Sequence, residues 1–596
     1  MPPSSWMRSL FYPSKNWFSA QPVKALSARL RNHGFSLVDL LRTKGVKEQA
    51  TNGLFNKISL LPPKEENNLR TEALPRLQEV EEIIGYTFKN PDLLEEAFTH
   101  ASYEEKCVSY ERLEYVGDSV LNILIAKEQY FLYPSLPPGA LSPLRAANVD
   151  TEKLARVAVR TKLHRYLRLR QPVLRKQIRD FVAALPRYPL HSKGLIDAPK
   201  VLADVVESTI GAIFIDSNSS LETTWEVAKG LLQPIITPEV LQTHPVKRLY
   251  ETCQKHGLKI QLVDLWSKEG AYEIIVDKHL KGRGKCRAKK EVALNRAANR
   301  AYNQIERKLG FKHHASSGHE QDQLILSIQT QLHDLHIHHP PEETTADPFP
   351  PLEEVEKIIG YDFRDRNLLA EAFTHGSYSD LTNTPSYERL EYVGDSVLNL
   401  LIAREDYFAY PDLQPGKLTR LRAANVDTEK LARVALKHNL HPYLRHNKPL
   451  FDSQIREFMD AIADYPLHSS GLVNAPKVLA DIVESTIGAI FLDSNSSLDT
   501  TWKVVKKLLE PIITPTTIQE HPVTKVFELC QKHGLKLQFV DLWSETGEIE
   551  VFVNDEFVER AIYTSKRLIA QNRAANNAYN EIIRKLSAEE NNGDNG

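Results

Sequence analysis

The chain has 596 residues, which is too long for one hydrophobic core and predicts about four domains of roughly 150 residues each. Of these residues 42% are hydrophobic and 26% are charged, and no apolar run approaches the roughly 18 residues that a membrane-spanning helix needs. We therefore expect globular domains and no membrane partner. The formal net charge of −2 does not indicate a nucleic-acid partner, so the local distribution of charge must decide.

The four cysteines form no CxxC pair and have no histidine at zinc-finger spacing. This argues against a disulfide framework and structural zinc, and it favours a reducing, intracellular compartment. Residues 1–38 contain basic residues and serines but no acidic residue, which is typical of an organelle transit peptide or of a disordered basic arm. The sequence leaves the compartment open between the nucleus or cytoplasm and an organelle.

The chain is an internal tandem repeat. YERLEYVGDSVLN occurs at Tyr110–Asn122 and again at Tyr387–Asn399, an offset of 277 positions, and RAANVDTEKLARVA and ESTIGAIF recur at the same offset. Each unit divides near HPV (His244 and His521), where a long helical stretch gives way to strand-like runs such as KIQLVDLW and LKLQFVDLW. The repeat therefore predicts two domains per unit.

This organisation predicts a multidomain protein in which two all-α domains (76–240 and 352–517) alternate with two small α+β domains (243–310 and 520–587). The other segments are predicted to be a basic N-terminal extension (1–75), a His-, Ser- and Pro-containing linker (311–351) and a disordered tail (588–596). A solvated linker is favoured over a histidine metal site. A flexible linker of this length reaches about 35 Å, which would let the two units pair.

Five carboxylates in the first all-α domain fall on two predicted helices. Glu111, Glu114 and Asp118 share one helical face, while the apolar residues Leu113, Val116, Val120 and Leu124 can turn toward a core. Asp204 and Glu207 lie three residues apart in a mostly apolar helix. One such pair alone is more often a salt bridge or a helix cap. Five carboxylates in two apolar helices instead favour a cation-binding site.

Arg112 and Lys200 would neutralise only part of this negative charge. No His or Cys joins the cluster, so we expect Mg²⁺, for which Mn²⁺ would substitute. Mg²⁺ held by carboxylates suits phosphodiester hydrolysis. The second unit repeats the set at Glu388, Glu391, Asp395, Asp481 and Glu484.

The small domains differ in charge. Seven Lys or Arg and no acid lie between Lys278 and Lys290, a pattern typical of phosphate contacts, with a plain solvated face as the alternative. The matching stretch Asp555–Arg567 balances three acids against three bases, which predicts weaker binding. The candidate nucleic-acid contacts are Lys281, Arg283, Lys285, Arg287, Lys289, Lys290, Lys566 and Arg567.

These segments resemble a known family. ERLEYVGDSVL is similar to the signature of ribonuclease III, and PKVLADVVESTIGAIF to its second catalytic segment, as in Dicer and plant Dicer-like enzymes. RAKKEVALNRAANRAY and TSKRLIAQNRAANNAY resemble double-stranded-RNA-binding domains of the α-β-β-β-α type. The whole chain looks like a plant ribonuclease III-like protein with duplicated units.

The resemblance implies a role for each carboxylate. It implies metal ligands at Glu114, Asp204, Glu207, Glu391, Asp481 and Glu484, and Asp118 and Asp395 as catalytic residues that also reach the metal. Glu207 and Glu484 share in catalysis, and Glu111 and Glu388 support it. Lys200 and Lys477 are candidate phosphate contacts.

The resemblance also implies an activity: a magnesium-dependent endoribonuclease for double-stranded RNA in RNA processing or silencing. Its catalytic domains would pair within one chain or as a homodimer, each cutting one strand to leave a 5′ phosphate and a 3′ overhang. The alternating order of the domains departs from that of Dicer, whose two catalytic domains lie side by side, and SKEGAY and SETGEI replace the usual Gly-Pro-x-His loop, which weakens the case for minor-groove contact there. The alternatives are a protein that sequesters double-stranded RNA without cutting it and an all-α nucleotide pyrophosphohydrolase.

Overall fold

The computed structural model describes residues 77–104, 108–241, 243–309, 349–382, 384–465 and 467–593. The predicted N-terminal extension (1–75) lies outside these ranges, as does the predicted linker apart from residues 349–351. In the described ranges, no helix is both long and apolar enough to cross a membrane.

The first large domain is helical, as predicted. Two short 3₁₀ turns, Leu163–Arg165 and Leu185–Arg187, interrupt it. Its helices are α4 (Gln78–Ile84), α5 (Pro91–Ala97), α6 (Glu111–Leu132), α7 (Pro138–Val149), α8 (Thr151–Arg160), α9 (Pro172–Ala184), α10 (Lys200–Asp216) and α11 (Leu221–Leu231).

The second large domain repeats this order and adds one short helix, α18, in the loop where the two units differ in length. It also contains two 3₁₀ turns, His441–Tyr443 and Ile462–Asp464. Its helices are α16 (Glu353–Ile359), α17 (Arg366–Ala372), α18 (Gly376–Thr382), α19 (Glu388–Ala409), α20 (Pro415–Val426), α21 (Thr428–Lys437), α22 (Pro449–Ala461), α23 (Lys477–Asp493) and α24 (Leu498–Leu509).

The centre of each large domain is a close helix crossing that glycine permits. The predicted apolar face of α6 is buried, with Leu113 and Val116 fully inaccessible to solvent. A Cβ added at Gly117 of α6 would lie 1.8 Å from the backbone oxygen of Glu207, and one added at Gly211 of α10 would lie 2.1 Å from that of Leu113. The two helices therefore touch through their backbones, and any larger side chain at the crossing would separate them.

The second large domain crosses α19 and α23 in the same way. A Cβ at Gly394 would lie 1.8 Å from the backbone oxygen of Glu484, and one at Gly488 would lie 2.2 Å from that of Leu390. The two domains thus hold their carboxylate-bearing helices at the same separation.

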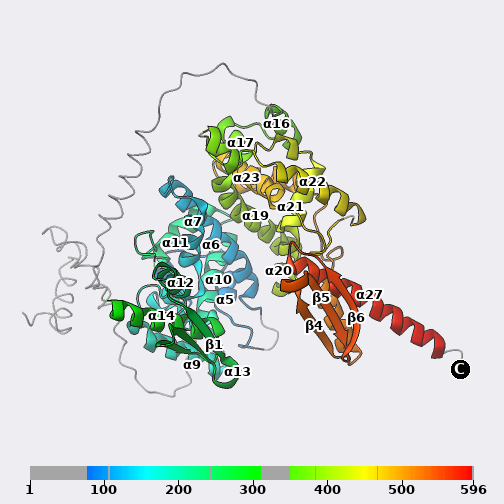
Figure 1. The fold of residues 1–596 in the computed structure, drawn as a ribbon. Helices are drawn as coiled ribbons and strands as arrows, with labels where there is room; N and C mark the ends of the chain where they lie inside the picture. Colours follow the sequence, from blue (N-terminus) through cyan, green and yellow to red (C-terminus); the bar gives the residue numbers. More distant parts are fainter. Residues whose placement is uncertain are drawn as a thin grey trace, which may run out of the picture.

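The two large domains pack face to face within the one chain, with α6 against α19 near the middle of the molecule (Figure 1). Their buried apolar residues form one continuous cluster. Arg112 reaches across to donate to the backbone oxygens of Tyr407, Tyr410 and Leu413 at 2.8, 3.0 and 2.8 Å. These carbonyls lie at and just beyond the C-terminal end of α19, where a helix lacks internal partners, so Arg112 caps it.

Arg389 makes the same contacts in the opposite direction. It donates to the backbone oxygens of Tyr130, Tyr133 and Leu136, at the end of α6. The expectation that Arg112 neutralises the carboxylate cluster is therefore wrong. Helix geometry turns it away from the cluster and toward the partner domain.

Each small domain has the predicted helix, strand, strand, strand, helix order, with a one-turn helix between the first two strands. Each sheet is antiparallel, in the orders β1-β2-β3 and β4-β5-β6, and each domain has its own apolar core. The elements are α12 (Pro245–Lys255), β1 (Ile260–Leu265), α13 (Trp266–Glu269), β2 (Ala271–Val276), β3 (Leu280–Lys285) and α14 (Lys290–Leu309), then α25 (Pro522–Lys532), β4 (Leu537–Leu542), α26 (Trp543–Thr546), β5 (Glu548–Val553), β6 (Glu556–Ile562) and α27 (Arg567–Gly593).

The last helix extends beyond the predicted domain boundary. Helix α27 continues to Gly593, so residues 588–593 of the predicted disordered tail are helical. The segment contains Ala588, Glu589 and Glu590, which are good helix formers, and the helix already present needs no new nucleus to extend through them.

The small domains dock on the loops that lead into α10 and α23. In the first, Arg296 donates to the backbone oxygen of Leu195 at 2.8 Å, and in the second, Arg573 donates to that of Leu472 at 2.9 Å. Each small domain therefore lies beside the large domain that precedes it in the chain.

The glycine crossing makes a testable prediction. Gly117→Ala should force α6 and α10 apart and lower the free energy of unfolding by roughly 1–3 kcal/mol, as overpacking of a core does. Gly230→Ala is a matched control in α11, because an added Cβ there meets nothing within 4 Å and removes the flexibility of a helical glycine. Thermal melting of the purified chain should show a lower midpoint for the first variant only; equal midpoints would contradict the close crossing.

Candidate active site

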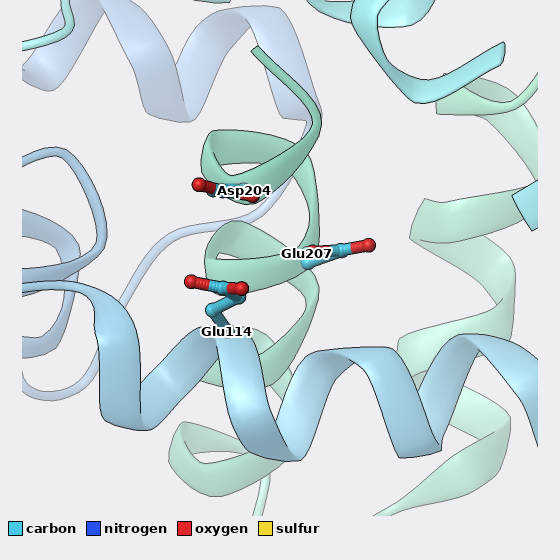
Figure 2. Close-up of side chains that lie close together, drawn as sticks. All are labelled: Glu114, Asp204 and Glu207. Atoms are coloured by element: carbon cyan, nitrogen blue, oxygen red, sulfur yellow. The ribbon is translucent and has the colours of Figure 1, made fainter. Parts of the chain in front are cut away.

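Three carboxylates come together where α6 and α10 cross. Glu114 rises from α6, and Asp204 and Glu207 lie on successive turns of α10 (Figure 2). One carboxylate oxygen from each residue lies within 4.8 Å of the other two. Residues 90 positions apart in the chain are therefore brought to the separation that a single bound cation requires.

The second large domain forms an equivalent group from Glu391 of α19 and Asp481 and Glu484 of α23, with the same 4.8 Å limit. This group lines a cavity of about 220 Å³, together with Glu388 and Asp395.

A lysine lies against each group. Lys200 Nζ contacts Glu114 at 2.5 Å and Asp204 at 2.7 Å, and Lys477 contacts Glu391 and Asp481 at 2.7 and 2.5 Å. Burial acts to lower the pKa of Lys200, but its bonds to the two carboxylates outweigh burial and raise it. The two predicted phosphate contacts thus serve here as counter-ions.

One ammonium group does not balance three carboxylates. Burial raises the pKa of Glu207 far above its usual value, and the nearby carboxylates of Asp118, Asp204 and Glu114 raise it further. Burial, with Asp395, Glu391 and Asp481, raises the pKa of Glu484 to about 9. Each group is therefore a partly buried carboxylate cluster in which, without a bound cation, one glutamate is held in its protonated form.

The donor set fits a hard divalent cation. All three donors are carboxylate oxygens, with no imidazole or thiolate among them, which is the chemistry that Mg²⁺ and Mn²⁺ prefer over Zn²⁺. A bound dication would also offset the burial and the carboxylate repulsion that together raise the pKa values of Glu207 and Glu484.

Asp118 and Asp395, predicted to reach the metal, do not join these groups. Asp118 accepts from Asn122 at 3.1 Å and pairs with Arg422 of the other large domain at 3.6 Å. Its side chain is 45% exposed, so it lies at the solvent side of the buried triad. Glu111 and Glu388 also lie outside the triads, although Glu388 lines the cavity of the second.

The predicted nucleic-acid contacts are exposed, but several already have a partner. Lys281 pairs with Glu273, Arg283 with Glu269, and Arg567 with Asp541, while Lys290 lies over the Trp266 ring. Lys285, Arg287 and Lys566 are exposed as well.

Lys289 is directed into the domain interface. Its Nζ donates to the backbone oxygen of Ala198 at 2.9 Å and pairs with Asp197 at 3.1 Å. In this arrangement it holds the small domain on the large one, because the start of α14 faces the loop before α10.

Two residues at the site were missed from the sequence. Arg145 and Arg422 each reach from one large domain to the aspartate of the other. In the sequence, these arginines stand out only because each begins the repeated RAANV motif. The residues around that motif do not indicate that the arginine contacts the other unit.

Comparison with known proteins gives the family. The ribonuclease III domain profile matches residues 111–218 and 388–495, which include both carboxylate groups. The chain is 50% identical over 234 residues to ribonuclease 3-like protein 3 of Oryza sativa subsp. japonica, covering 39% of this chain and 78% of that protein. The chain belongs to the ribonuclease III family.

Two further proteins are similar to parts of this chain. Endoribonuclease Dicer homolog 1 of Arabidopsis thaliana is 44% identical over 242 residues, covering 39% of this chain and 13% of that protein. The nuclease domain of ribonuclease III from Campylobacter jejuni is 27% identical, with a TM-score of 0.22, and covers 27% of this chain and 99% of that structure. Family membership identifies the chain as an endoribonuclease, a family whose members depend on a divalent metal.

The raised pKa of Glu484 predicts pH-dependent metal binding. Because the pKa is about 9 in the metal-free protein, Glu484 carries a proton at pH 7 that a cation must displace. Affinity for Mn²⁺ should rise from pH 7 to about 9 and then level off, with protons released on binding. Calorimetry in buffers of different protonation enthalpy measures this release. Glu484→Gln should reduce the number of protons released. A Mn²⁺ affinity that stays constant from pH 7 to about 9 would show that Glu484 does not carry this proton.

Proposed function

We propose that the chain is a Mg²⁺-dependent endoribonuclease that cuts double-stranded RNA at two sites in one molecule, one for each strand. The observation that carries the proposal is the pair of three-carboxylate groups on equivalent helix crossings of two domains that face each other. One chain would thereby contain both of the catalytic domains that are needed to cut the two strands of a duplex. The products would have a 5′ phosphate and a 3′ overhang.

In the first site, Glu114, Asp204 and Glu207 would hold the metal, and the equivalent residues would do so in the second. A bound divalent cation activates water for attack on a phosphodiester and stabilises the leaving oxygen. Asp118, at the exposed side of the triad, is placed to accept a proton from water or to orient it. Lys200 is exposed beside the same carboxylates, where it would meet a backbone phosphate.

The small domains would bind the duplex by its shape and phosphates. Their α-β-β-β-α order is that of the double-stranded-RNA-binding domains that the sequence resembles. The first presents exposed Lys285 and Arg287 within residues 278–290, a stretch that contains no acid, whereas Arg567 of the second is paired with Asp541. We propose that the first small domain provides most of the affinity for RNA.

Replacing one carboxylate per site tests the two-site proposal. Glu207→Gln removes a ligand from the first site only, so it should leave one cut per duplex, as should Glu484→Gln in the second. The double variant should lose cleavage by at least a hundredfold while still binding RNA, since an unmade metal contact costs several kcal/mol of transition-state stabilisation. Denaturing gels reveal nicks that native gels do not.

Glu226→Gln is the matched control, because it makes the same change at an exposed position of α11. It should cut both strands at the parent rate. Full cleavage by the double variant would remove these residues from the mechanism, and loss of RNA binding by it would point to misfolding or to a binding role.

The unequal small domains predict unequal effects on binding. Neutralising Lys285, Arg287 and Lys290 should weaken duplex binding more than neutralising Lys566 and Arg567, and the salt dependence should become shallower, because fewer phosphate contacts remain. Filter binding in Ca²⁺ at several salt concentrations measures both. Equal losses in the two sets would mean that local charge does not decide which domain binds.

A further inference from the structure

An arginine from the opposite large domain lies beside each active site. The cavity at the second triad is lined by Glu391, Asp481 and Glu484 of the second domain and also by residues of the first domain, namely Pro138, Ser142 and Arg145. Arg145 lies on α7, which contacts α19 across the interface.

The Arg145 guanidinium is held at three points. It pairs with Asp395 at 3.6 Å, donates to the hydroxyl of Ser396, and lies over the Tyr392 ring at 4.9 Å from the centroid. The side chain is 20% exposed, and Ser396 is almost fully buried. A partly buried guanidinium with fixed donors is well suited to hold a carboxylate in one orientation.

Arg422 makes the same three contacts in the opposite direction. It pairs with Asp118 at 3.6 Å, donates to Ser119, and lies over the Tyr115 ring at 4.9 Å. The arrangement is therefore built twice, and in both copies the arginine and the aspartate belong to different domains.

Arg145 and Arg422 are not needed simply to join the two domains. Arg112 and Arg389 already join the domains by bonding backbone carbonyls at the helix ends. Arg145 and Arg422 differ because one of their amino groups reaches the aspartate next to the triad. Asn122, one turn along α6, donates a hydrogen bond to the Asp118 carboxylate, with which Arg422 forms an ion pair.

We propose that Arg422 and Arg145 are positioning residues that act across the domain interface: Arg422 orients Asp118 in the first site, and Arg145 orients Asp395 in the second. Each site is then incomplete without the opposite domain, although it has all of its own carboxylates. This inference rests on the proposed two-site cleavage.

The test combines arginine and glutamate variants in the full chain. Arg422→Gln should slow the first site by about ten- to a hundredfold, the range for loss of a residue that orients an active-site ligand, and leave a nicked duplex. Adding Glu207→Gln, in the same site, should leave the nicking unchanged. Adding Glu484→Gln, in the other site, should remove the remaining cut.

Arg145→Gln should behave as the mirror image. It should still nick when combined with Glu484→Gln and lose both cuts when combined with Glu207→Gln. The opposite pattern, in which each arginine serves the site of its own domain, would overturn the inference, as would parent-like cutting by both arginine variants.

Two further measurements separate positioning from a loss of structure. Arg112→Gln loosens the same interface without touching an aspartate, so it should affect the two cuts equally, and the same equal loss in Arg422→Gln would overturn the inference. Mn²⁺ bound per chain, counted by electron paramagnetic resonance, should match the parent in Arg422→Gln; loss of an ion would mean that the site has collapsed. If the parent chain leaves duplex RNA intact, both the proposed function and this inference are wrong. If both arginine variants cut the two strands at the parent rate, the proposed function stands and only this inference is wrong.

Discussion

The structure depends on a backbone-to-backbone helix crossing that only glycine allows. At Gly117 and Gly211, and again at Gly394 and Gly488, helices approach so closely that a Cβ would overlap a backbone oxygen. This approach places carboxylates from two segments within 4.8 Å of one another in a buried setting. Burial and the neighbouring carboxylates raise the pKa values of Glu207 on α10 and Glu484 on α23, which is the cost of placing carboxylates there. The crossing therefore creates both the geometry of the site and its demand for a cation.

The same central helices also join the two halves of the molecule. One side of α6 crosses α10, while another packs against α19, and Arg112 and Arg389 cap the ends of the partner helices. A displacement of α6 or α19 would therefore disturb both a carboxylate triad and the interface between the two large domains. Because the two large domains belong to one chain, they pack against each other within one molecule. The two sites are therefore present in equal number, and each lies next to the opposite domain.

Much of the fold followed from local patterns in the chain. The spacing of Leu113, Val116 and Val120 predicted the buried face of α6, and the strand-like runs predicted β1 and β4; the structure confirms these elements. Local patterns failed for side chains that cross an interface. Arg112 was expected beside the carboxylates but caps α19. Lys289, a candidate RNA contact, also bonds to the large domain, and no local pattern indicated that contact.

Helix periodicity and repetition were thus sufficient for the number of domains, their class and the residues that could bind a cation, because these properties depend on neighbours three or four positions away. The meeting of Glu114 with Asp204, and of Asp118 with Arg422, depends on how helices far apart in sequence pack. No local spacing encodes such contacts, since they result from burying apolar faces against one another. For that reason the chain alone indicated two carboxylate clusters, whereas only the folded molecule showed that each lies beside an arginine from the other half.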